Sequence, residues 1–228
     1  MKEYFKKPIA NRPAFFLAGA LVLASFACSL LSTDQADAPQ AVEPTVGETP
    51  CGLFASIPAA PQYEAAPPLL IDTAGQYYAT VKMANGGEFK IQLYADKAPI
   101  TVNSFVFLAC KGFFDGTTFH RVLDGFMAQG GDPTGTGMGG PGYEFVNEDS
   151  DLVFDKAGVV AMANAGRDTN GSQFFITFAP AEFLNGGYTI FGQVISGMEV
   201  VNGITRRDPD QSPSFAGDAM ESIVITLE

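Results

Sequence analysis

Short stretches of alternating apolar and polar residues, bounded by glycine, proline or asparagine, dominate this chain from residue 76 onward. The first two such stretches run from Tyr77 to Met83 and from Glu88 to Tyr94. They flank the sequence Ala84-Asn-Gly-Gly87, and an Asn-Gly pair favours the positive φ angles of a tight hairpin turn. A β-hairpin is therefore predicted between residues 77 and 94.

Further short strands are predicted along the rest of the chain, and only two segments have helical spacing. Ile100 to Cys110 repeats apolar residues at helical intervals and ends at Lys111-Gly112, and a second helix is predicted from Met198 to Thr205. Many short strands with two helices predict a mainly β fold, built on an antiparallel sheet or barrel. The other predicted strands are Thr117 to Val122, Phe126 to Gly130, Val159 to Ala163, Gln173 to Phe178, Tyr188 to Val194 and Glu221 to Leu227.

Residues 1 to 28 have the order of an export signal. Four basic residues lie within the first twelve positions, and the uncharged run Pro13 to Leu31 follows them. Cys28 follows the small Ala27 in a context that resembles a bacterial lipoprotein signal, which is cut before a cysteine that then carries lipid. An uncleaved membrane anchor, which needs about 20 apolar residues, and an ordinary cleaved signal are the alternatives. All three place the rest of the chain outside the cytoplasm, and the first two anchor it to the envelope membrane.

Residues 29 to 75 form a segment that is rich in proline, alanine and acidic residues and has no lysine or arginine. Its seven prolines remove backbone donors and block helices, so we predict an extended, solvated linker that precedes a folded domain at residues 76 to 228. Without residues 1 to 28, which hold four of the 13 basic and one of the 25 acidic residues, the net charge is −15. A domain this acidic repels phosphate backbones and anionic lipids. We therefore expect no nucleic-acid partner, and we expect contact with the membrane through the N-terminal anchor only.

The three cysteines predict no disulfide framework. Cys110 falls within the apolar helical pattern and is interpreted as a buried small residue. Cys28 and Cys51 are expected to pair only where Cys28 carries no lipid. The sequence contains no cluster of metal ligands, so neither a metal nor another cofactor is expected.

Two features that can signal catalysis or nucleotide binding lack the context that such functions need. His120 is the only histidine, and no Gly-x-Ser-x-Gly elbow accompanies it, so we interpret it as a packed or surface residue and disfavour hydrolysis. Gly135 to Gly140 matches a dinucleotide-binding pattern, but Pro141-Gly142 follows where that pattern needs a helix to hold the pyrophosphate. Neither feature is expected to carry the function.

Two longer segments join hydrogen-bonding side chains to clusters of large apolar ones. By residue type alone, an ordinary core with a few satisfied polar groups is the simpler interpretation, and a binding pocket is the alternative. Neither segment has the paired acid, base or thiol that bond breaking usually needs. They read Phe119-His-Arg-Val-Leu-Asp-Gly-Phe-Met-Ala-Gln-Gly-Gly-Asp132 and Met162-Ala-Asn-Ala-Gly-Arg-Asp-Thr-Asn-Gly-Ser-Gln-Phe-Phe-Ile176.

Both segments closely resemble the two signature segments of the cyclophilin family of peptidyl-prolyl cis-trans isomerases. Phe191-Gly-Gln-Val194 and Gly197-Met-Glu-Val-Val201 fit the same family, so the resemblance covers residues 76 to 228. It implies a closed eight-stranded antiparallel barrel capped by two helices, with the site on its outer face. It also implies a monomeric isomerase without a cofactor, which acts on proline-containing polypeptides such as unfolded or exported proteins.

The resemblance also assigns roles to individual residues. Arg121 matches the essential arginine of the family. Phe183 and Leu184 fall where many members have Trp-Leu, and Tyr188 falls where many have His; the phenyl ring keeps an apolar wall but lacks the indole N–H. Phe126, Met127 and Phe175 match the walls of the proline pocket, and Gln129, Ala163, Asn164 and Gln173 match the groove that holds the peptide backbone.

These residue types suit isomerisation on chemical grounds. Rotation about an X–Pro bond breaks amide resonance, with a barrier of about 20 kcal/mol, but no covalent bond is broken, so neither a nucleophile nor a metal is required. A guanidinium such as that of Arg121 can donate to the prolyl nitrogen as the nitrogen regains its lone pair. The rival hypotheses are a non-catalytic proline-peptide-binding module or chaperone that uses the same groove, and a purely structural envelope lipoprotein, against which the intact site motifs argue.

Overall fold

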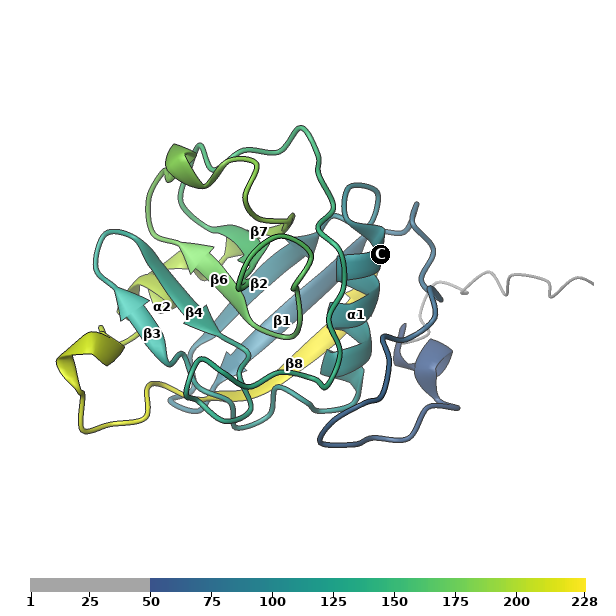
Figure 1. The fold of residues 1–228 in the computed structure, drawn as a ribbon, viewed down its shortest axis with the longest axis horizontal. Coiled ribbons are helices and arrows are strands. Elements are labelled where there is room, and N and C mark those ends of the chain that lie inside the picture. Colours follow the sequence, from purple (N-terminus) through teal and green to yellow (C-terminus); the bar gives the residue numbers. More distant parts are fainter. Residues whose placement is uncertain (1–49) are drawn as a thin grey trace, which may run out of the picture. The chain divides into compact units, whose positions relative to one another are not determined.

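The computed structural model describes residues 50–228, so the predicted export signal, Cys28 and the linker up to residue 49 lie outside the described residues. The described part contains eight strands, two α-helices and three short 3-10 helices (Figure 1). No helix among residues 50–228 is both long enough and apolar enough to span a membrane. The strands are β1 (Tyr77–Met83), β2 (Glu88–Leu93), β3 (Arg121–Leu123), β4 (Met127–Gly130), β5 (Val159–Met162), β6 (Phe174–Thr177), β7 (Ile190–Ser196) and β8 (Met220–Leu227), the α-helices are α1 (Pro99–Cys110) and α2 (Met198–Gly203), and the 3-10 helices are η1 (Pro50–Phe54), η2 (Glu182–Leu184) and η3 (Pro209–Gln211).

The eight strands form a single antiparallel sheet in the order β3-β4-β6-β5-β7-β2-β1-β8. β1 and β2 form the predicted hairpin, with Tyr77 opposite Leu93 and Lys82 opposite Glu88. Gly86 in the turn has a φ of 87°, which is the left-handed conformation that the Asn-Gly pair predicts. The predicted mainly β, antiparallel fold with two helices is therefore confirmed.

The sheet is curled but open, so the predicted closed barrel is wrong. β3 and β8 are the two edges of the sheet, and no ladder of hydrogen bonds joins them among the described residues. The gap is crossed by an isolated bridge, Thr118 opposite Ala219, and by a bond of 2.9 Å from the Phe119 N–H to the Asp218 carbonyl. β3 is only three residues long, and the residues before it form single bonds instead of a strand, so the edge is too short for closure.

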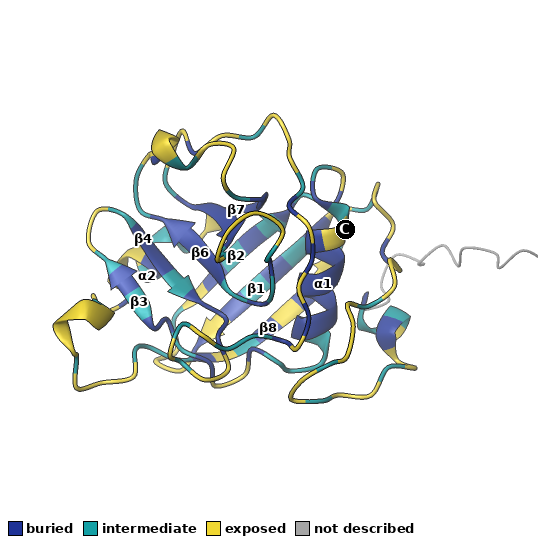
Figure 2. Ribbon diagram, in the orientation of Figure 1, coloured by how far each residue is buried: buried dark blue, intermediate teal, exposed yellow. Residues whose placement is uncertain are grey.

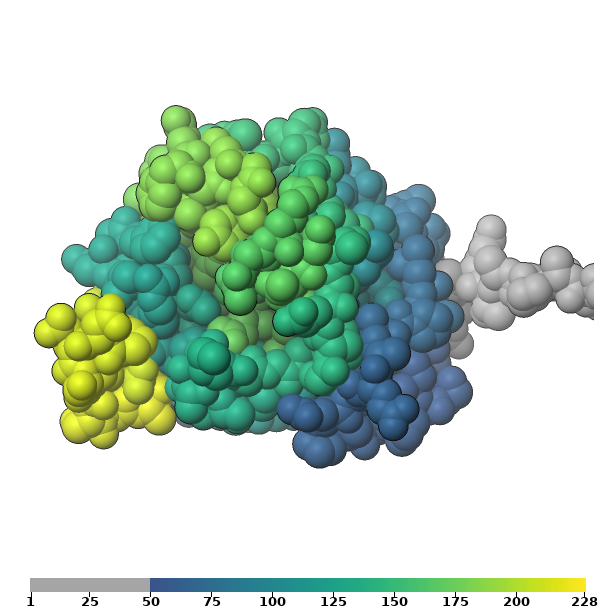
Figure 3. Space-filling model, in the orientation of Figure 1, coloured from purple at the N-terminus to yellow at the C-terminus, as the bar shows by residue number. Residues whose placement is uncertain are grey.

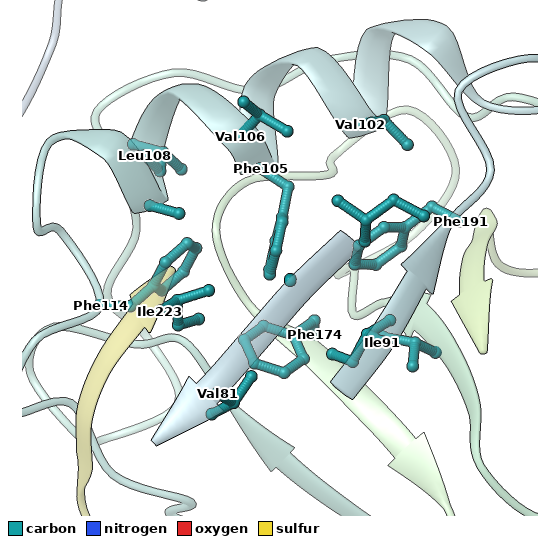
Figure 4. Packing of buried hydrophobic residues seen from close by; sticks show 14 of the residues in the cluster. Val81, Ile91, Val102, Phe105, Val106, Leu108, Phe114, Phe174, Phe191 and Ile223 are labelled. Atoms are coloured by element: carbon teal, nitrogen blue, oxygen red, sulfur yellow. The ribbon is translucent and has the colours of Figure 1, made fainter. Parts of the chain in front are cut away.

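Helix α1 lies across the sheet and supplies much of the core. Figure 4 shows Phe105 pointing from α1 toward Phe114, Phe174 and Phe191. The centroid of the Phe105 ring is 5.1, 5.6 and 5.2 Å from the centroids of those three rings. Every residue from Thr101 to Ala109 is buried, so the side of α1 away from the sheet is buried as well (Figure 2). A second cover is therefore needed on the outer side of α1.

Residues 50–75, which we call the extension, provide this cover, whereas the sequence predicted a solvated linker there. Phe54 is fully buried. The rings of Phe54 and Tyr63 pack on Phe107 of α1, with centroid distances of 5.4 and 4.8 Å. The Lys111 ammonium donates to the Phe54 carbonyl over 2.7 Å. The proline-rich composition correctly excludes a long helix in this segment. The prediction of full solvation is wrong, because the extension packs on α1. The domain boundary at residue 76 stays a prediction.

Cys51 in η1 and Cys110 at the end of α1 form a disulfide, with Cα atoms 5.1 Å apart. Cys110, interpreted from the sequence as a buried small residue, is instead a partly buried disulfide cysteine, and Cys51 has a partner other than Cys28. The two cysteines are separated by 59 positions, and the apolar helical pattern around Cys110 hides its pairing. The disulfide attaches the start of the extension to the helix that the extension covers.

Replacing both Cys51 and Cys110 by serine is expected to lower the free energy of unfolding by about 2–4 kcal/mol. The bond closes a loop across a separation of 59 residues and so removes conformational entropy from the unfolded chain. Urea denaturation of the oxidised chain and of the double variant measures the difference. The reduced unmodified chain is the control and should match the variant; an oxidised chain no more stable than either would show that the disulfide adds no stability.

Candidate functional site

Strand β6 is buried on both faces and separates two apolar clusters. Phe174 and Ile176 belong to the main core, whereas Phe175 between them belongs to a second cluster on the other face of the strand. Strand alternation causes this division, since successive side chains point to opposite faces of a sheet. Gln129 on β4 lies opposite Phe175, so the neighbouring strand adds its polar side chain beside the second cluster.

The second cluster brings together the three residues assigned to the proline pocket and two others, Leu184 and Tyr188, that were assigned to the site. Met127 and Phe175 are 1% and 5% exposed and form the buried part of the cluster. Phe126, Leu184 and Tyr188 are partly buried and pack against it. These five residues come from three separate segments of the chain, which β4, β6 and the turn at η2 hold next to one another.

Aromatic contacts fix the orientation of Phe175. Its ring stacks on Phe154 with a centroid distance of 5.8 Å and an interplanar angle of 14°. Tyr188 meets the same ring edge-on at 5.4 Å. Phe183 is 77% exposed, and its ring centroid lies 5.5 Å from that of Phe126, so Phe183 forms an exposed rim. Phe154 is a supporting residue that the sequence did not reveal, because it lies in a loop without periodicity.

Arg121 lies beside this apolar cluster. It is the first residue of β3 and pairs with Gln129 of β4. Its Nη1 is 3.9 Å from the Sδ of Met127. Among residues 50–228 Arg121 forms no ion pair, whereas Arg167 and Arg206 pair with carboxylates. The guanidinium of Arg121 therefore sits against the apolar cluster without a carboxylate that would hold its donors.

The side-chain amides of Gln129 and Gln173 form a hydrogen-bonded row next to Arg121. The Gln129 Nε2 donates to the Gln173 Oε1 over 2.9 Å. The Gln173 Nε2 donates to the carbonyls of Gly137 and Gly139 over 3.0 and 2.9 Å. The Ala163 N–H donates to the Gln173 carbonyl over 2.9 Å. The side-chain bonds fix Gln173 between Gln129 of β4 and residues 130–142, which we call the glycine-rich loop.

Asn164 lies at the other side of the same groove. Its Nδ2 donates to the Gly187 carbonyl over 3.2 Å, and its Oδ1 accepts from the Gly166 N–H over 3.2 Å. Together with Gln129, Ala163 and Gln173, Asn164 lines a cavity of about 720 Å³. Figure 3 shows the hollowed face of the molecule, between the teal residues of the glycine-rich loop and the green segments that follow it. The four groove residues assigned from the sequence thus line one cavity.

The Asp132 carboxylate holds the glycine-rich loop in place. Its Oδ1 accepts from the N–H and the hydroxyl of Thr134 over 2.7 and 2.8 Å, and its Oδ2 accepts from the N–H groups of Gly137 and Gly139 over 2.6 and 3.2 Å. Burial of the carboxyl raises the pKa of Asp132, but the hydrogen bonds from Thr134, Gly139 and Gly137 outweigh burial and leave the pKa below its ordinary value. The loop therefore presents its carbonyls to Gln173 in a fixed position.

Asp132→Asn is expected to lower the free energy of unfolding at pH 7 by about 1–3 kcal/mol, because an amide NH₂ opposes the loop N–H groups that the carboxylate accepted. Since the folded pKa of Asp132 is depressed, its stabilising contribution is complete above the unfolded pKa of about 3.9 and is lost as the pH falls through the folded pKa. Urea denaturation between pH 7 and pH 2 should show the two proteins converging in acid. If the difference in free energy of unfolding between the two proteins stayed constant from pH 7 to pH 2, the stabilising role assigned to the Asp132 carboxylate would be contradicted.

His120, interpreted as a packed or surface residue, is buried in the structure, so the packed alternative holds. Burial lowers the pKa of His120 below its ordinary value, and this outweighs the opposing effect of Asp132. A neutral, enclosed imidazole under the glycine-rich loop has no access to the groove. Residues 50–228 also contain no group of three or more histidines, cysteines or carboxylates that could hold a metal ion.

Comparison with known proteins agrees with this geometry. A family model described as "Cyclophilin type peptidyl-prolyl cis-trans isomerase/CLD" matches residues 78–226. The chain is 52% identical over 120 residues to the human "Peptidyl-prolyl cis-trans isomerase-like 1", covering 51% of this chain and 72% of the relative. It is 44% identical over 172 residues to the "Peptidyl-prolyl cis-trans isomerase B" of Streptomyces anulatus, covering 67% and 98%.

A solved structure leads to the same family. The crystal structure of a Cryptosporidium parvum "cyclophilin type peptidyl-prolyl cis-trans isomerase" is 35% identical to this chain and matches it with a TM-score of 0.58. The match covers 66% of this chain and 97% of that one. Fold, matched residues and relatives all agree: the chain belongs to the family of cyclophilin-type peptidyl-prolyl cis-trans isomerases.

Proposed function

We propose that this chain catalyses the cis–trans isomerisation of X–Pro peptide bonds in the groove that the second apolar cluster and the adjoining cavity form. The observation that carries the proposal is the position of the Arg121 guanidinium, 3.9 Å from Met127 at the buried part of that cluster. A proline ring in the cluster would have its nitrogen within reach of a permanently charged donor. Many relatives are named peptidyl-prolyl cis-trans isomerases, which supports the same reaction.

The apolar walls hold the proline ring while the preceding residue rotates. Met127 and Phe175 form the buried part of the pocket, and Phe126 and Leu184 lie at its edge. A ring seated there is removed from water, which otherwise favours the polar planar amide over the twisted one. The contacts of Phe154 and Tyr188 with Phe175 keep this wall in a fixed orientation.

Arg121 stabilises the twisted bond. In the planar amide the nitrogen lone pair is delocalised and accepts no hydrogen bond, whereas at 90° of twist the lone pair returns to the nitrogen. A donor placed there binds the transition state more tightly than the ground state, which is the condition for acceleration. Arginine suits this role because it stays protonated at any working pH and carries several N–H donors.

The row of amides binds the peptide backbone on either side of the proline. Gln129 and Asn164 line the cavity, and the bonds from Gln129 through Gln173 to the glycine-rich loop fix the Gln129 side chain before a peptide arrives. Preorganised donors reduce the entropy lost on binding. A site that recognises a backbone and one ring should accept many sequences. The exposed Phe183 and the partly buried Tyr188 then contact residues next to the proline.

We also propose that the chain acts outside the cytoplasm, anchored through a lipidated Cys28 or the hydrophobic segment before it, and assists the folding of exported proteins. The export-type sequence supports this location. The Cys51–Cys110 disulfide supports it as well, since structural disulfides persist in oxidising compartments. Metabolic labelling with a fatty acid, followed by cell fractionation, tests the lipid anchor: label that Cys28→Ala does not remove, or a chain recovered from the cytoplasm, would contradict it.

A non-catalytic peptide-binding module would use the same groove, and one experiment separates the two functions. Two-dimensional NMR exchange spectroscopy on an Ala-Pro peptide needs no coupling protease. Uncatalysed interconversion takes roughly 10–100 s, so exchange peaks at mixing times below a second require catalysis. We expect such peaks with the oxidised chain and none without it. Shifted peptide signals without exchange peaks would overturn the proposal and leave a receptor for proline-containing peptides.

A further inference from the structure

The 720 Å³ cavity extends beyond the proline pocket and includes a residue from outside the matched domain. Gln129, Asn164 and Gln173 line it on the domain side, and Gln62 of the extension lines it as well. The family match begins only at residue 78, so Gln62 belongs to a segment that the family model does not include. This part of the binding surface is therefore a feature of this chain.

Close backbone contacts hold Gln62 at the cavity. The Tyr63 N–H donates to the Pro141 carbonyl over 2.7 Å. A methyl group added to Gly142 would lie 2.5 Å from the Tyr63 carbonyl oxygen and 3.1 Å from the Cβ of Gln62, so this position tolerates only glycine. Gly142 also has a φ of 94°, which disfavours other residues. Figure 3 shows the blue extension lying against the teal residues of this loop.

Two further contacts join the extension to α1, and one bond within the extension shapes the turn before Gln62. The Tyr63 ring packs edge-on against Phe107 of α1 at 4.8 Å. The Tyr63 hydroxyl accepts from the Ala60 N–H over 3.1 Å, which closes the turn before Gln62. At the start of the extension, the disulfide between Cys51 and Cys110 joins η1 to the end of α1. The extension is thus attached to the domain at Cys51 and again at Tyr63, the residue next to Gln62.

The chemistry of the cavity favours a positively charged or hydrogen-bond-donating side chain. Glu144 is the only charged residue among those that line it, and the others are amides, hydroxyls, glycines and small or apolar residues. Both Gln62 and Glu144 are exposed on the cavity rim. The chain as a whole carries a net charge of −12, which adds to the attraction of cations.

We propose that the extension completes a second peptide subsite, in which Gln62 and Glu144 receive the side chain of a lysine or arginine that flanks the substrate proline. This proposal rests on the proposed isomerase function, since it concerns the peptide that occupies the same groove. The Gln62 amide oxygen and the Glu144 carboxylate accept the hydrogen bonds of the cationic group. The Cys51–Cys110 disulfide keeps the extension in position, so the subsite depends on oxidation of that pair.

The test compares matched peptides within each variant. Peptides carry lysine or alanine at each of the two positions before and after an Ala-Pro unit, and NMR exchange gives the ratio of their catalytic efficiencies. Gln62→Glu is expected to raise the lysine-to-alanine ratio about threefold, and Gln62→Lys and Glu144→Gln to lower it about threefold, as for exposed charge pairs. Gln211→Lys makes the same charge change in η3, at an exposed residue that does not line the cavity, and should leave the ratio unchanged.

The disulfide gives an independent arm. The Cys51→Ser, Cys110→Ser double variant, checked by circular dichroism for a folded sheet, is expected to lose most of the preference for lysine while still isomerising the alanine peptide. A lysine preference that is the same in the Gln62 variants, or that Gln211→Lys alters as much, would overturn the subsite. Failure of the unmodified chain to accelerate even the alanine peptide would instead overturn the proposed function, so the two failures are distinguishable.

Discussion

Arg121→Ala is expected to lower the catalytic efficiency toward an Ala-Pro peptide by about 10²–10³-fold, the usual cost of removing one preorganised transition-state donor. The side chain lies beside Met127 and forms no ion pair among residues 50–228, so its removal leaves no carboxylate unpaired. The loss should therefore fall on catalysis and not on stability. NMR exchange rates at several peptide concentrations measure it.

Two further variants make this result specific. Arg121→Lys keeps the charge but replaces the planar guanidinium with a single ammonium, so we expect an activity between those of the unmodified chain and the alanine variant. Arg167→Ala removes an exposed arginine that pairs with Asp149, outside the groove, and should leave activity unchanged. If Arg121→Ala retained more than about a third of the activity, the guanidinium would lower the activation free energy too little for the role assigned to it.

Phe174→Ala is expected to lower the free energy of unfolding by about 3–5 kcal/mol. Phe174 is fully buried, and its ring meets those of Phe105, Phe114 and Phe119 edge-on at 5.6, 5.9 and 6.2 Å. Truncation leaves a cavity lined by rings that cannot collapse into it, because α1 and the sheet fix their backbones. Since whole domains are stable by about 5–15 kcal/mol, the loss is a large fraction of the total.

Urea denaturation of both proteins gives the difference, and Phe183→Ala is the matched control. Phe183 is 77% exposed, so the same truncation there should cost less than about 1 kcal/mol. Equal losses at Phe174 and Phe183 would contradict the position of the core. At urea concentrations near its unfolding transition, the Phe174→Ala variant is also expected to bind less peptide, because Phe174 and Phe175 share one strand.

Local pattern was enough to predict most of the regular structure. The predicted hairpin corresponds to β1 and β2, and the helix expected from Ile100 to Cys110 corresponds to α1 at Pro99–Cys110. These elements follow from alternation, helical spacing and turn residues, which short windows of sequence contain. The sequence predicts one strand from Thr117 to Val122, but β3 begins only at Arg121, because in residues 117–120 only Thr118 pairs, in isolated bridges instead of a ladder.

The open sheet and the docked extension depend on long-range contacts, which explains why they were not predicted. Whether β3 meets β8 depends on how the whole sheet curls, which no local pattern records. For the extension a signal is present: Phe107 lies on the side of α1 away from Phe105 and is buried as well, so the helix needs cover on two sides. The proline-rich composition predicts a solvated segment regardless of this apolar excess, and the 59 positions between Cys51 and Cys110 conceal their pairing.

The site shows the same division between local and long-range information. The motifs supplied Arg121 and the groove residues, and the structure brings them together around one cluster and one cavity. Their catalytic roles stay predictions until they are measured. Phe154, which stacks on Phe175, and Gln62, which lines the cavity, lie in irregular segments outside both motifs, so only the folded chain reveals them.

The most direct test of the mechanism measures peptide affinity and exchange rate together, in the same NMR titration, for the unmodified chain and for Arg121→Ala. The account predicts that the variant binds the Ala-Pro peptide within about threefold of the unmodified affinity, because the apolar pocket and the amide groove remain, while exchange of the bound peptide is lost. The contradicting result is an exchange rate that falls only in proportion to affinity. Arg121 would then bind the planar peptide and give the twisted bond no additional stabilisation.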